Sequence, residues 1–294
     1  MSRGPETSEA TTIAALLEAA RRGLADAPFE APRREGALLL AHVLGRSEAS
    51  ILAFPEAAVA APDAERFHEL LGRRLSGEPV AYLFGEREFY GRPFRVDSRV
   101  LIPRPETEHI VDAVLRLELT PAARIVDVGT GSGCLAVTLA LELPEATVTA
   151  TDRSPAALAV ARDNAQRLGA ANRVALFATD LTAGLRLEAV DLVVSNPPYV
   201  DPSERDSLSV EVVGFEPHLA LFAPGRGHSV VARLLVELTD LRPGTHLILE
   251  IGYDQSAWLE AAVAELDAWR LIEILDDYSG IPRTAVLRRA GPVD

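Results

Sequence analysis

Apolar residues near the start of the chain recur every three to four positions, which is the spacing of one face of an α-helix. The first such run follows Thr11 and Thr12, either of which is suited to cap a helix, and its apolar positions are Ile13, Leu16, Leu17, Ala20 and Leu24. A second run opens after Pro32, and a third ends at Gly77, as proline and glycine commonly mark helix boundaries. Residues from about 10 to 77 are therefore predicted to form a small helical bundle.

The pattern changes after Pro79, where aromatic and β-branched residues replace the helical spacing: Tyr82, Phe84, Phe89, Tyr90, Phe94 and Val96. Gly91 and Pro93 stand in the middle of this stretch, as in a turn. We expect a β-hairpin here that connects two domains. The proline-stiffened segment 101–105 is expected to be extended, and Glu106 to begin the next helix.

Strands and helices alternate after Arg124. The predicted strands lie at 125–128, 148–151, about 174–178, about 190–195 and 246–251, with two more near the end. The predicted helices lie at 135–143, 155–168, about 228–241 and about 255–267. Repeated strand–helix units form a mostly parallel sheet with helices on both faces. Little chain separates the last two strands, so the final strand is expected to be antiparallel.

The composition is that of an ordinary globular protein, long enough for about two domains. Of 294 residues, 48% are hydrophobic and 24% are charged, which excludes a disordered or collagen-like chain. The 29 basic residues are all arginine, and 43 acidic residues bring the net charge to -14. This balance argues against a protein that tracks a nucleic-acid backbone, because such binding relies on clustered positive charge.

Cysteine and histidine usage argues against a disulfide or a metal site. Cys134 is the only cysteine and stands at the start of a predicted helix, where a small buried residue packs well. The six histidines are scattered and show no ligand spacing. Residues 1–9 lack the charged-then-apolar pattern of a signal peptide, and no apolar run is long enough for a membrane span. We therefore expect a cytoplasmic protein without a metal.

A glycine-rich loop follows the first strand of the predicted sheet: Asp127-Val128-Gly129-Thr130-Gly131-Ser132-Gly133. Glycine lets the backbone turn sharply and lets a ligand approach it, and nucleotides bind such sheets at the carboxyl end of the first strand. A tight turn without a ligand is the simpler interpretation. Two acids favour a ligand. Asp127 can attract positive charge, and Asp152 closes the second strand, where an acid binds ribose hydroxyls.

The spacing of the glycines narrows the choice of ligand. The loop is G-x-G-x-G rather than the G-x-G-x-x-G of a dinucleotide fold, and it lacks a run of donors suited to a pyrophosphate. A cofactor with an adenosine and a cationic end but no phosphate fits better, and S-adenosylmethionine is such a molecule. Thr130 and Ser132 are expected to supply hydroxyl contacts. Asp180, after the next strand, is a candidate for the adenine side, and a solvated loop acid is an equal alternative.

A second motif, Asn196-Pro197-Pro198-Tyr199, follows the fourth strand. A planar amino group is a poor nucleophile because its lone pair is delocalised, so it must be oriented. The side-chain carbonyl of Asn196 and the backbone carbonyl of Pro197 can accept its two N–H groups, which aims the lone pair at a methyl group. Tyr199 can stack on the flat group and exclude water. No general base is then required, because the proton can leave after transfer.

Together these motifs resemble class I methyltransferases that act on planar amino groups. Longer stretches resemble one family among them, the release factor glutamine methyltransferases called PrmC or HemK: residues 77–83, 85–91 and 100–108, Phe215-Glu216-Pro217 and Ala220-Leu221. The resemblance implies a Rossmann-like class I methyltransferase sheet. It also implies methylation at N5 of the glutamine in the Gly-Gly-Gln tip of bacterial class I peptide release factors, with S-adenosylmethionine as donor.

The resemblance further implies that Gly129, Gly131, Gly133, Asp152 and Asn196 bind cofactor or substrate, and the chemistry of the residues adds the others. The expected catalytic residues are Asn196, Pro197 and Tyr199, and the expected substrate-binding residues are Asn196, Pro197, Pro198 and Tyr199. The expected cofactor-binding residues are Asp127, Gly129, Thr130, Gly131, Ser132, Gly133, Asp152, Asp180, Leu181 and Asn196. Some family members carry an aromatic residue where this chain has Leu181, which can still make an apolar contact.

Three parts of the chain are expected: a helical substrate-recognition domain over residues 1–78, a β-hairpin linker over 79–105, and an S-adenosylmethionine-binding domain over 106–294. Arg104 in the linker and Glu106 directly after it are expected either to close over the cofactor or the glutamine, or to form an interdomain ion pair. Glu216 is expected to brace the tetrad loop or to begin a helix.

Other functions remain open from the sequence. Ribosomal-protein glutamine methyltransferases share the tetrad, and residues 103–108 favour the release factor branch. An adenine-amino DNA methyltransferase would need base flipping and a basic groove, which the net charge disfavours. A binding protein that has lost catalysis is a third alternative, and the intact motifs argue against it.

Overall fold

The computed structural model describes residues 11–25 and 32–291, and the chain divides into two compact units, one ending at Phe84 and the other beginning at Gly85. Residues 1–9, for which the sequence predicts no signal peptide, lie outside the described residues. Across the described ranges, no helix combines the length and the apolar character that a bilayer crossing requires.

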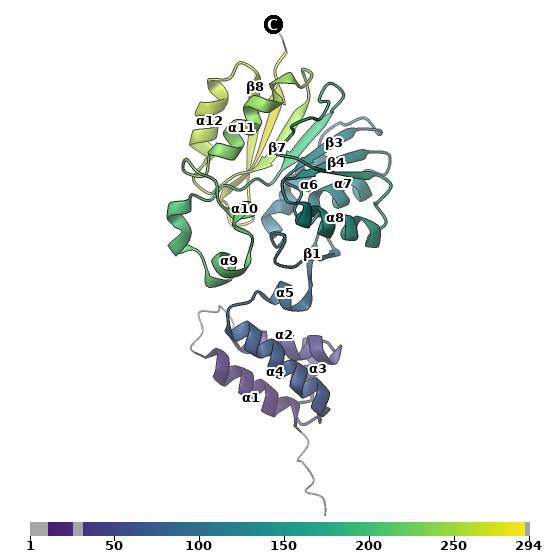
Figure 1. Ribbon diagram of the computed structural model, residues 1–294, viewed down its shortest axis with the longest axis vertical. Coiled ribbons are helices and arrows are strands. Elements are labelled where there is room, and N and C mark those ends of the chain that lie inside the picture. The colour runs from purple at the N-terminus through teal and green to yellow at the C-terminus, as the bar shows by residue number, and fades with distance from the viewer. Residues whose placement is uncertain (1–10, 26–31, 292–294) are drawn as a thin grey trace, which may run out of the picture. The chain divides into compact units, whose positions relative to one another are not determined.

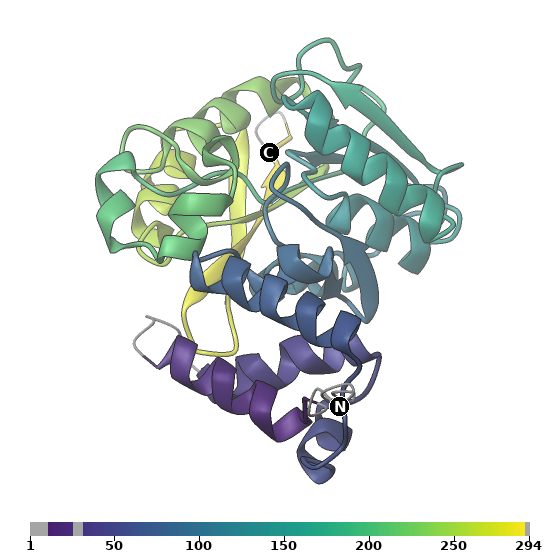
Figure 2. The ribbon, with the colours of Figure 1, turned by 60° about the horizontal axis from the view of Figure 1, so that its bottom comes forward.

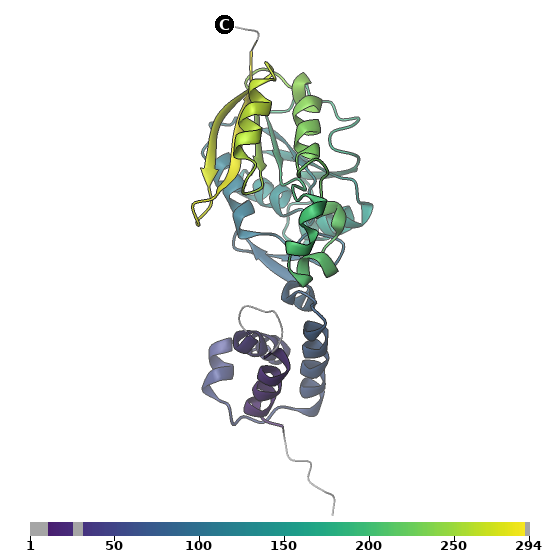
Figure 3. The ribbon, with the colours of Figure 1, turned by 90° about the vertical axis from the view of Figure 1, so that its left-hand side faces the viewer.

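The first unit is a helical bundle, as the apolar spacing predicts (Figure 3). Its helices are α1 (Ile13–Leu24), α2 (Pro32–Leu44), α3 (Glu48–Ala53), α4 (Ala61–Leu75) and α5 (Val80–Phe84). Thr12 caps α1, because its hydroxyl accepts a hydrogen bond of 3.3 Å from the Ala15 amide. The ring of Phe67 is fully buried among leucines of α1 and α2. Buried Arg74 donates hydrogen bonds of 2.8 and 2.9 Å to Glu35, which pairs its charge.

Two of these helices differ from the expectation. The six-residue α3 has too few residues for its apolar spacing to stand out, although Ser47 caps it by accepting from the Ser50 amide at 3.2 Å. The short α5 lies where aromatic residues suggest a strand. The amides of Tyr82 and Leu83 both donate to the carbonyl of Pro79, at 2.9 and 3.1 Å, which winds this segment into a helical turn.

The second unit is built on a seven-stranded sheet in the order β5-β4-β3-β6-β7-β9-β8. Its strands are β3 (Arg124–Val128), β4 (Thr147–Asp152), β5 (Val174–Ala178), β6 (Leu192–Ser195), β7 (His246–Glu250), β8 (Trp269–Asp276) and β9 (Pro282–Arg289). Strands β3 to β7 run parallel, and β9 lies antiparallel between β7 and β8. The predicted fold class, a mostly parallel sheet with an antiparallel last strand, is confirmed.

Helices cover both faces of this sheet (Figures 1 and 2). One face carries α6 (Glu108–Leu115), α7 (Cys134–Glu142) and α8 (Pro155–Arg167), and the other carries α11 (Ser229–Glu237) and α12 (Ser256–Ala264). Successive residues of a central strand serve opposite faces. In β3, Ile125 packs with the first group of helices and Val126 with the second. The central strands are therefore buried on both sides, as expected for parallel strands.

The predicted β-hairpin is present, as β1 (Glu86–Phe89) and β2 (Arg92–Arg95). Tyr90 and Gly91 have φ values of 50° and 70°, as a tight two-residue turn requires. The rings of Phe89 and Phe94 are fully buried and lie in the same core as residues of α6. The hairpin lies within the unit that begins at Gly85.

The strand order brings the two sequence motifs together. The chain runs outward from β3 to β5 and returns to β6 on the other side of β3, and open α/β sheets bind ligands at such a reversal. The glycine loop follows β3, and the Asn196 tetrad follows β6. The shorter helices are η1 (Pro105–Thr107), η2 (Pro202–Ser207), α9 (Val210–Phe215), α10 (His218–Leu221) and η3 (Leu238–Asp240). Between β6 and α11 the sequence gives only one sign of a helix, the alternative that Glu216 begins one.

Candidate active site

Backbone hydrogen bonds hold the glycine loop against strand β4. The amides of Gly129 and Thr130 both donate to the carbonyl of Thr151, at 2.9 Å each. The φ values of the loop glycines lie in the left-handed region, where side chains are strained: Gly129 at 76°, Gly131 at 54° and Gly133 at 81°. A Cβ at Gly133 would lie 3.1 Å from the Cβ of Ala161 on α8, whereas a Cβ on the other two glycines would meet nothing within 4 Å. The loop is closed toward α8 and open on its other side.

Asp127 lies behind the glycine loop. It is fully buried, and its Oδ2 accepts hydrogen bonds from the Thr130 hydroxyl at 2.6 Å and from the Ala136 amide at 3.2 Å. Burial raises the pKa of Asp127 to about 7, although these hydrogen bonds oppose the rise. Asp127 therefore joins the loop to the first turn of α7, and it does not line the cavity beside the loop.

Asp152 closes β4 and lines that cavity. Its Oδ2 accepts from the Gly131 amide at 2.9 Å, and its Oδ1 accepts from the Ser154 amide at 2.8 Å. Each carboxylate oxygen has more than one acceptor site, so both can accept further hydrogen bonds from a ligand. The backbone thus orients the carboxylate without using up its capacity.

Asp180 and Leu181 follow β5 on another wall of the cavity. The Asp180 carboxylate is partly exposed and pairs with Arg233 at 2.9 Å and with Arg153 at 3.7 Å. Leu181 has a φ of 50°, an uncommon conformation for a branched residue, and its side chain is half-buried against the core. Leu181 therefore adds apolar surface to this wall.

The cavity beside the loop has a volume of about 580 Å³, within the range of cofactor sites. Thr130 and Ser132 belong to its wall, although the Thr130 hydroxyl donates to Asp127. Three arginines also line it, and each is paired: Arg99 with Asp97 at 2.6 Å, and Arg153 and Arg233 with Asp180. Arg233 also pairs with Glu237 at 3.2 Å. The wall therefore offers a carboxylate and apolar surface, and each of its guanidinium groups is already paired with an acid.

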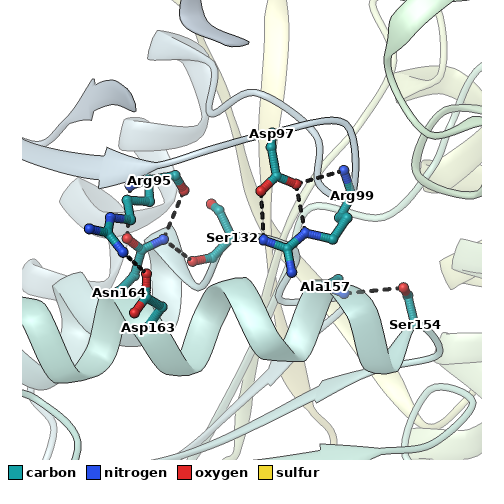
Figure 4. A network of polar contacts seen from close by, with 8 residues as sticks. All are labelled: Arg95, Asp97, Arg99, Ser132, Ser154, Ala157, Asp163 and Asn164. Carbon is teal, nitrogen blue, oxygen red and sulfur yellow. Dashed lines mark hydrogen bonds and ion pairs between the residues drawn. The ribbon is translucent and has the colours of Figure 1, made fainter. Parts of the chain in front are cut away.

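Asn164 of α8, which the sequence did not single out, joins the glycine loop to the β-hairpin (Figure 4). Its Nδ2 donates to the carbonyls of Ser132 and Arg95, at 2.8 and 3.0 Å, and its Oδ1 accepts from the Arg95 amide at 2.8 Å. The Arg95 guanidinium reaches back to Asp163 on the same helix. Asn164 is fully buried, so these bonds fasten the loop to a second, independent segment.

The tetrad lies where the large cavity meets a second cavity of about 260 Å³. Asn196 lines both cavities. Pro198 faces the larger one, and Pro197 and Tyr199 face the smaller one. The structure thus brings both predicted motifs to the larger cavity, and Asn196 lies where this cavity meets the smaller one.

A chain of hydrogen bonds behind the tetrad joins it to Thr107 and Glu250, to which the sequence analysis assigns no role. Asn196 donates from Nδ2 to Oγ1 of Thr107 at 2.9 Å, and the Thr107 hydroxyl donates to Oε2 of Glu250 at 2.7 Å. The Tyr199 hydroxyl donates to Oε1 of the same carboxylate at 2.8 Å. Thr107 and Glu250 are each 1% exposed. Burial raises the pKa of the Glu250 carboxyl. Burial of Tyr199, together with the negative charge of Glu250, raises the pKa of the Tyr199 hydroxyl well above its usual value.

The linker residues are tied to the segment that follows the tetrad. Arg104 pairs with Glu216 at 2.5 Å, and the Ile102 amide donates to the other oxygen of that carboxylate at 3.0 Å. Glu216 is 4% exposed, so it braces the extended segment before α6. All three residues belong to the sheet unit. Glu106 is half-buried, and its charge contributes to the raised pKa of Glu250.

Cys134 does not have the environment of a nucleophile. Burial raises the pKa of its thiol to about 12, and the side chain packs against the core under α7. Among the residues that the structure describes, no three histidine, cysteine or acidic side chains are grouped so as to hold a metal ion.

Comparison with known proteins covers both units. The PrmC N-terminal domain family matches residues 15–85, and the methyltransferase small domain family matches residues 111–214. A release factor glutamine methyltransferase from Nitratidesulfovibrio vulgaris is 40% identical over 288 residues, which are 97% of this chain and 98% of the relative. One from Koribacter versatilis is 40% identical over 283 residues, covering 95% and 99%. A solved methyltransferase from Pyrococcus furiosus has a TM-score of 0.52 at 19% identity, covers 75% of this chain and 98% of its own, and shows the fold.

Proposed function

The chain belongs to the family of release factor glutamine methyltransferases, and from this premise we propose that it transfers a methyl group from S-adenosylmethionine to the side-chain amide nitrogen, N5, of a glutamine in a release factor. We take the target to be the glutamine of the Gly-Gly-Gln tip of bacterial class I release factors. The observation that carries the proposal is the position of Asn196 on the boundary between a cofactor-sized cavity and a smaller one.

The residues around the larger cavity fit S-adenosylmethionine. Gly129 and Gly131 have no Cβ and leave open space for a close approach, and Asp152 can accept hydrogen bonds from ribose hydroxyls. Leu181 offers an apolar contact to an adenine ring, and Asp180 lies on the same wall. The lining arginines are paired with carboxylates, which suits a cofactor without phosphate. When bound, the cofactor supplies a methyl group on a positively charged sulfur.

Asn196 and Pro197 would orient the substrate. The Oδ1 of Asn196 and the backbone carbonyl of Pro197 receive no hydrogen bond from the described residues, so both can accept the N–H groups of a glutamine amide. Held at both hydrogens, the amide nitrogen presents its lone pair to the larger cavity, and this placement supplies most of the rate enhancement. Tyr199 would pack on the flat amide and exclude water. The extra proton leaves the nitrogen after transfer, so no side chain has to act as a base.

The helical unit would recognise the body of the release factor. We assign this role to the helical substrate-recognition domain over residues 1–78, which overlaps the stretch that matches the PrmC N-terminal domain. The methyltransferase domain over residues 106–294 would carry the chemistry, with residues 79–105 connecting the two. A release factor substrate implies that the protein works in the cytoplasm.

Mass spectrometry tests the proposal directly. A purified bacterial class I release factor is incubated with the protein and S-adenosylmethionine, and a parallel reaction contains duplex DNA. We expect the tryptic peptide that carries the Gly-Gly-Gln tip to gain the mass of one methylene, with fragmentation placing it on the glutamine, and the DNA to remain unmethylated. An unmodified tip peptide together with methylated adenine in the DNA would overturn the proposal in favour of the adenine alternative.

A further inference from the structure

We propose that Thr107 and Glu250 are positioning residues, which fix the orientation of the Asn196 amide so that its carbonyl oxygen faces the substrate. The proposal rests on the proposed function, because it concerns the side chain that would hold the reacting amide. Neither residue belongs to the glycine loop or to the tetrad, and they reach the site from η1 and from the end of β7.

The orientation of the Asn196 side chain decides what it can hold. A carboxamide has nearly the same shape in its two orientations, but one presents an acceptor and the other presents two donors. A glutamine NH₂ group can only be held by acceptors, because its nitrogen lone pair must remain available for the methyl group. With Asn196 turned over, two NH₂ groups would face each other. The side of the Asn196 amide away from the substrate therefore needs a partner that can form a hydrogen bond with its NH₂ group but not with its carbonyl oxygen.

Thr107 can act as this partner because its single hydroxyl hydrogen is already used. The hydroxyl donates to Glu250 at 2.7 Å, so only its lone pairs remain for Asn196, 2.9 Å away. A lone pair accepts an N–H and repels a carbonyl oxygen. The Asn196 amide must then place Nδ2 toward Thr107 and Oδ1 on the opposite side.

Glu250 sets the direction of each hydrogen bond in this series. Burial raises the pKa of Glu250, but the hydrogen bonds from the hydroxyls of Thr107 and Tyr199, at 2.7 and 2.8 Å, and the charge of Arg283 favour its ionised form. An ionised carboxylate can only accept. Glu250 follows Leu249, which pairs with Ser195 in the parallel register of β6 and β7, so it lies beside the start of the tetrad. Burying a carboxylate costs free energy, and a leucine or methionine would fill the same space without that cost. One buried acid thereby orients two side chains of the tetrad.

A matched pair of substitutions tests the role of the hydroxyl. Thr107→Val keeps the shape and removes the hydroxyl, and Thr107→Ser keeps the hydroxyl. We expect kcat for release factor methylation to fall about 10- to 100-fold in Thr107→Val and to remain within about threefold of wild type in Thr107→Ser. Because Thr107 also lines the larger cavity, the affinity for S-adenosylhomocysteine is measured for each variant, and we expect it to change less than about threefold.

Two further variants separate positioning from general effects on the core. Thr138→Val removes another fully buried threonine hydroxyl, on α7, whose Oγ1 has no partner in the described part of the chain, and it should leave kcat unchanged. Glu250→Gln keeps the size of the side chain but presents an NH₂ group to one of the two hydroxyls. It should lower kcat about as much as Thr107→Val does. Glu250→Gln therefore provides an independent test if Thr107→Val folds poorly.

Nuclear magnetic resonance reads the orientation without catalysis. The side-chain ¹H–¹⁵N signals of Asn196 are identified by their absence from Asn196→Ala. We expect one of the two amide protons to exchange slowly with water in the wild type and in Thr107→Ser, and both to exchange rapidly in Thr107→Val. Slow exchange retained in Thr107→Val, or a wild-type kcat in that variant, would overturn the proposal. Failure of the wild type to methylate any release factor would instead contradict the proposed function, and the exchange comparison would still decide the role of Thr107.

Discussion

The side chain of Asn164 binds the backbone of Arg95 on both sides of the residue, accepting from its amide at 2.8 Å and donating to its carbonyl at 3.0 Å. A third hydrogen bond, to the carbonyl of Ser132, extends this link to the glycine loop. The hairpin and the loop are distant in sequence, and a single buried amide satisfies backbone groups of both.

Asn164→Asp should therefore destabilise the sheet unit and weaken cofactor binding. The carboxylate cannot donate, so the carbonyls of Arg95 and Ser132 would lose their partner and face a negative charge. We expect the free energy of unfolding to fall by about 3 kcal/mol, as for two buried groups left unpaired. Urea denaturation measures this, and Gln166→Glu, the same chemical change at an exposed position of α8, is the control. Equal stability of the two variants would show that the link is unimportant.

Asp127 should make stability depend on pH. Its folded pKa of about 7 lies above the ordinary value of 3.8, so the folded state binds the proton more tightly. The contribution of this residue to the free energy of unfolding is therefore largest at low pH and is lost as pH rises from about 4 to 7. Asp127→Asn cannot ionise and should remove this dependence.

The comparison is made by urea denaturation at pH 5 and pH 8. Between pH 5 and pH 8, the free energy of unfolding of Asp127→Asn should rise by up to about 3 kcal/mol relative to that of the wild type. A difference between the two proteins that stays constant over this range would contradict the raised pKa of Asp127.

Asp152 and Asp180 should contribute unequally to cofactor binding. The Asp152 carboxylate is oriented by two backbone amides, whereas that of Asp180 is shared with two arginines. Asp152→Asn should weaken the binding of S-adenosylhomocysteine about 10- to 100-fold, because the carboxylate accepts charge-assisted hydrogen bonds. Asp180→Asn should weaken it less than about threefold. Isothermal titration gives both constants, and the reverse order would exclude the ribose role of Asp152.

Most of the fold follows from local sequence patterns. Buried strands such as Leu192–Ser195 are predicted because they are continuous apolar runs between turn residues. The first helix is predicted because its apolar residues have helical spacing and Thr12 can cap it. Short helices such as α3 and α9 have too few residues to show a period. The placement of residues 80–84 in a helix depends on Pro79, whose carbonyl accepts two amides, and aromatic content suggests a strand instead.

The candidate site also contains residues that the sequence predicts and residues that it does not. The glycine loop and the Asn196 tetrad are continuous motifs that chemistry can interpret, and the strand order brings them together. Asn164, Thr107 and Glu250 act through contacts with residues far along the chain, which no local pattern reveals. Two of them left a signal: Glu250 is an acid at the end of a strand, as Asp152 is, and Thr107 lies within the stretch 100–108 that resembles the family.

Single-turnover kinetics with Asn196→Ala tests the central claim most directly, that two carbonyl oxygens present the glutamine amide to the methyl donor. The variant keeps the larger cavity and loses one of the two acceptors. With saturating S-adenosylmethionine and a purified class I release factor, we expect the rate of methyl transfer to fall at least about 1000-fold, while cofactor affinity changes less than about threefold. Transfer within about tenfold of the wild-type rate would contradict the account.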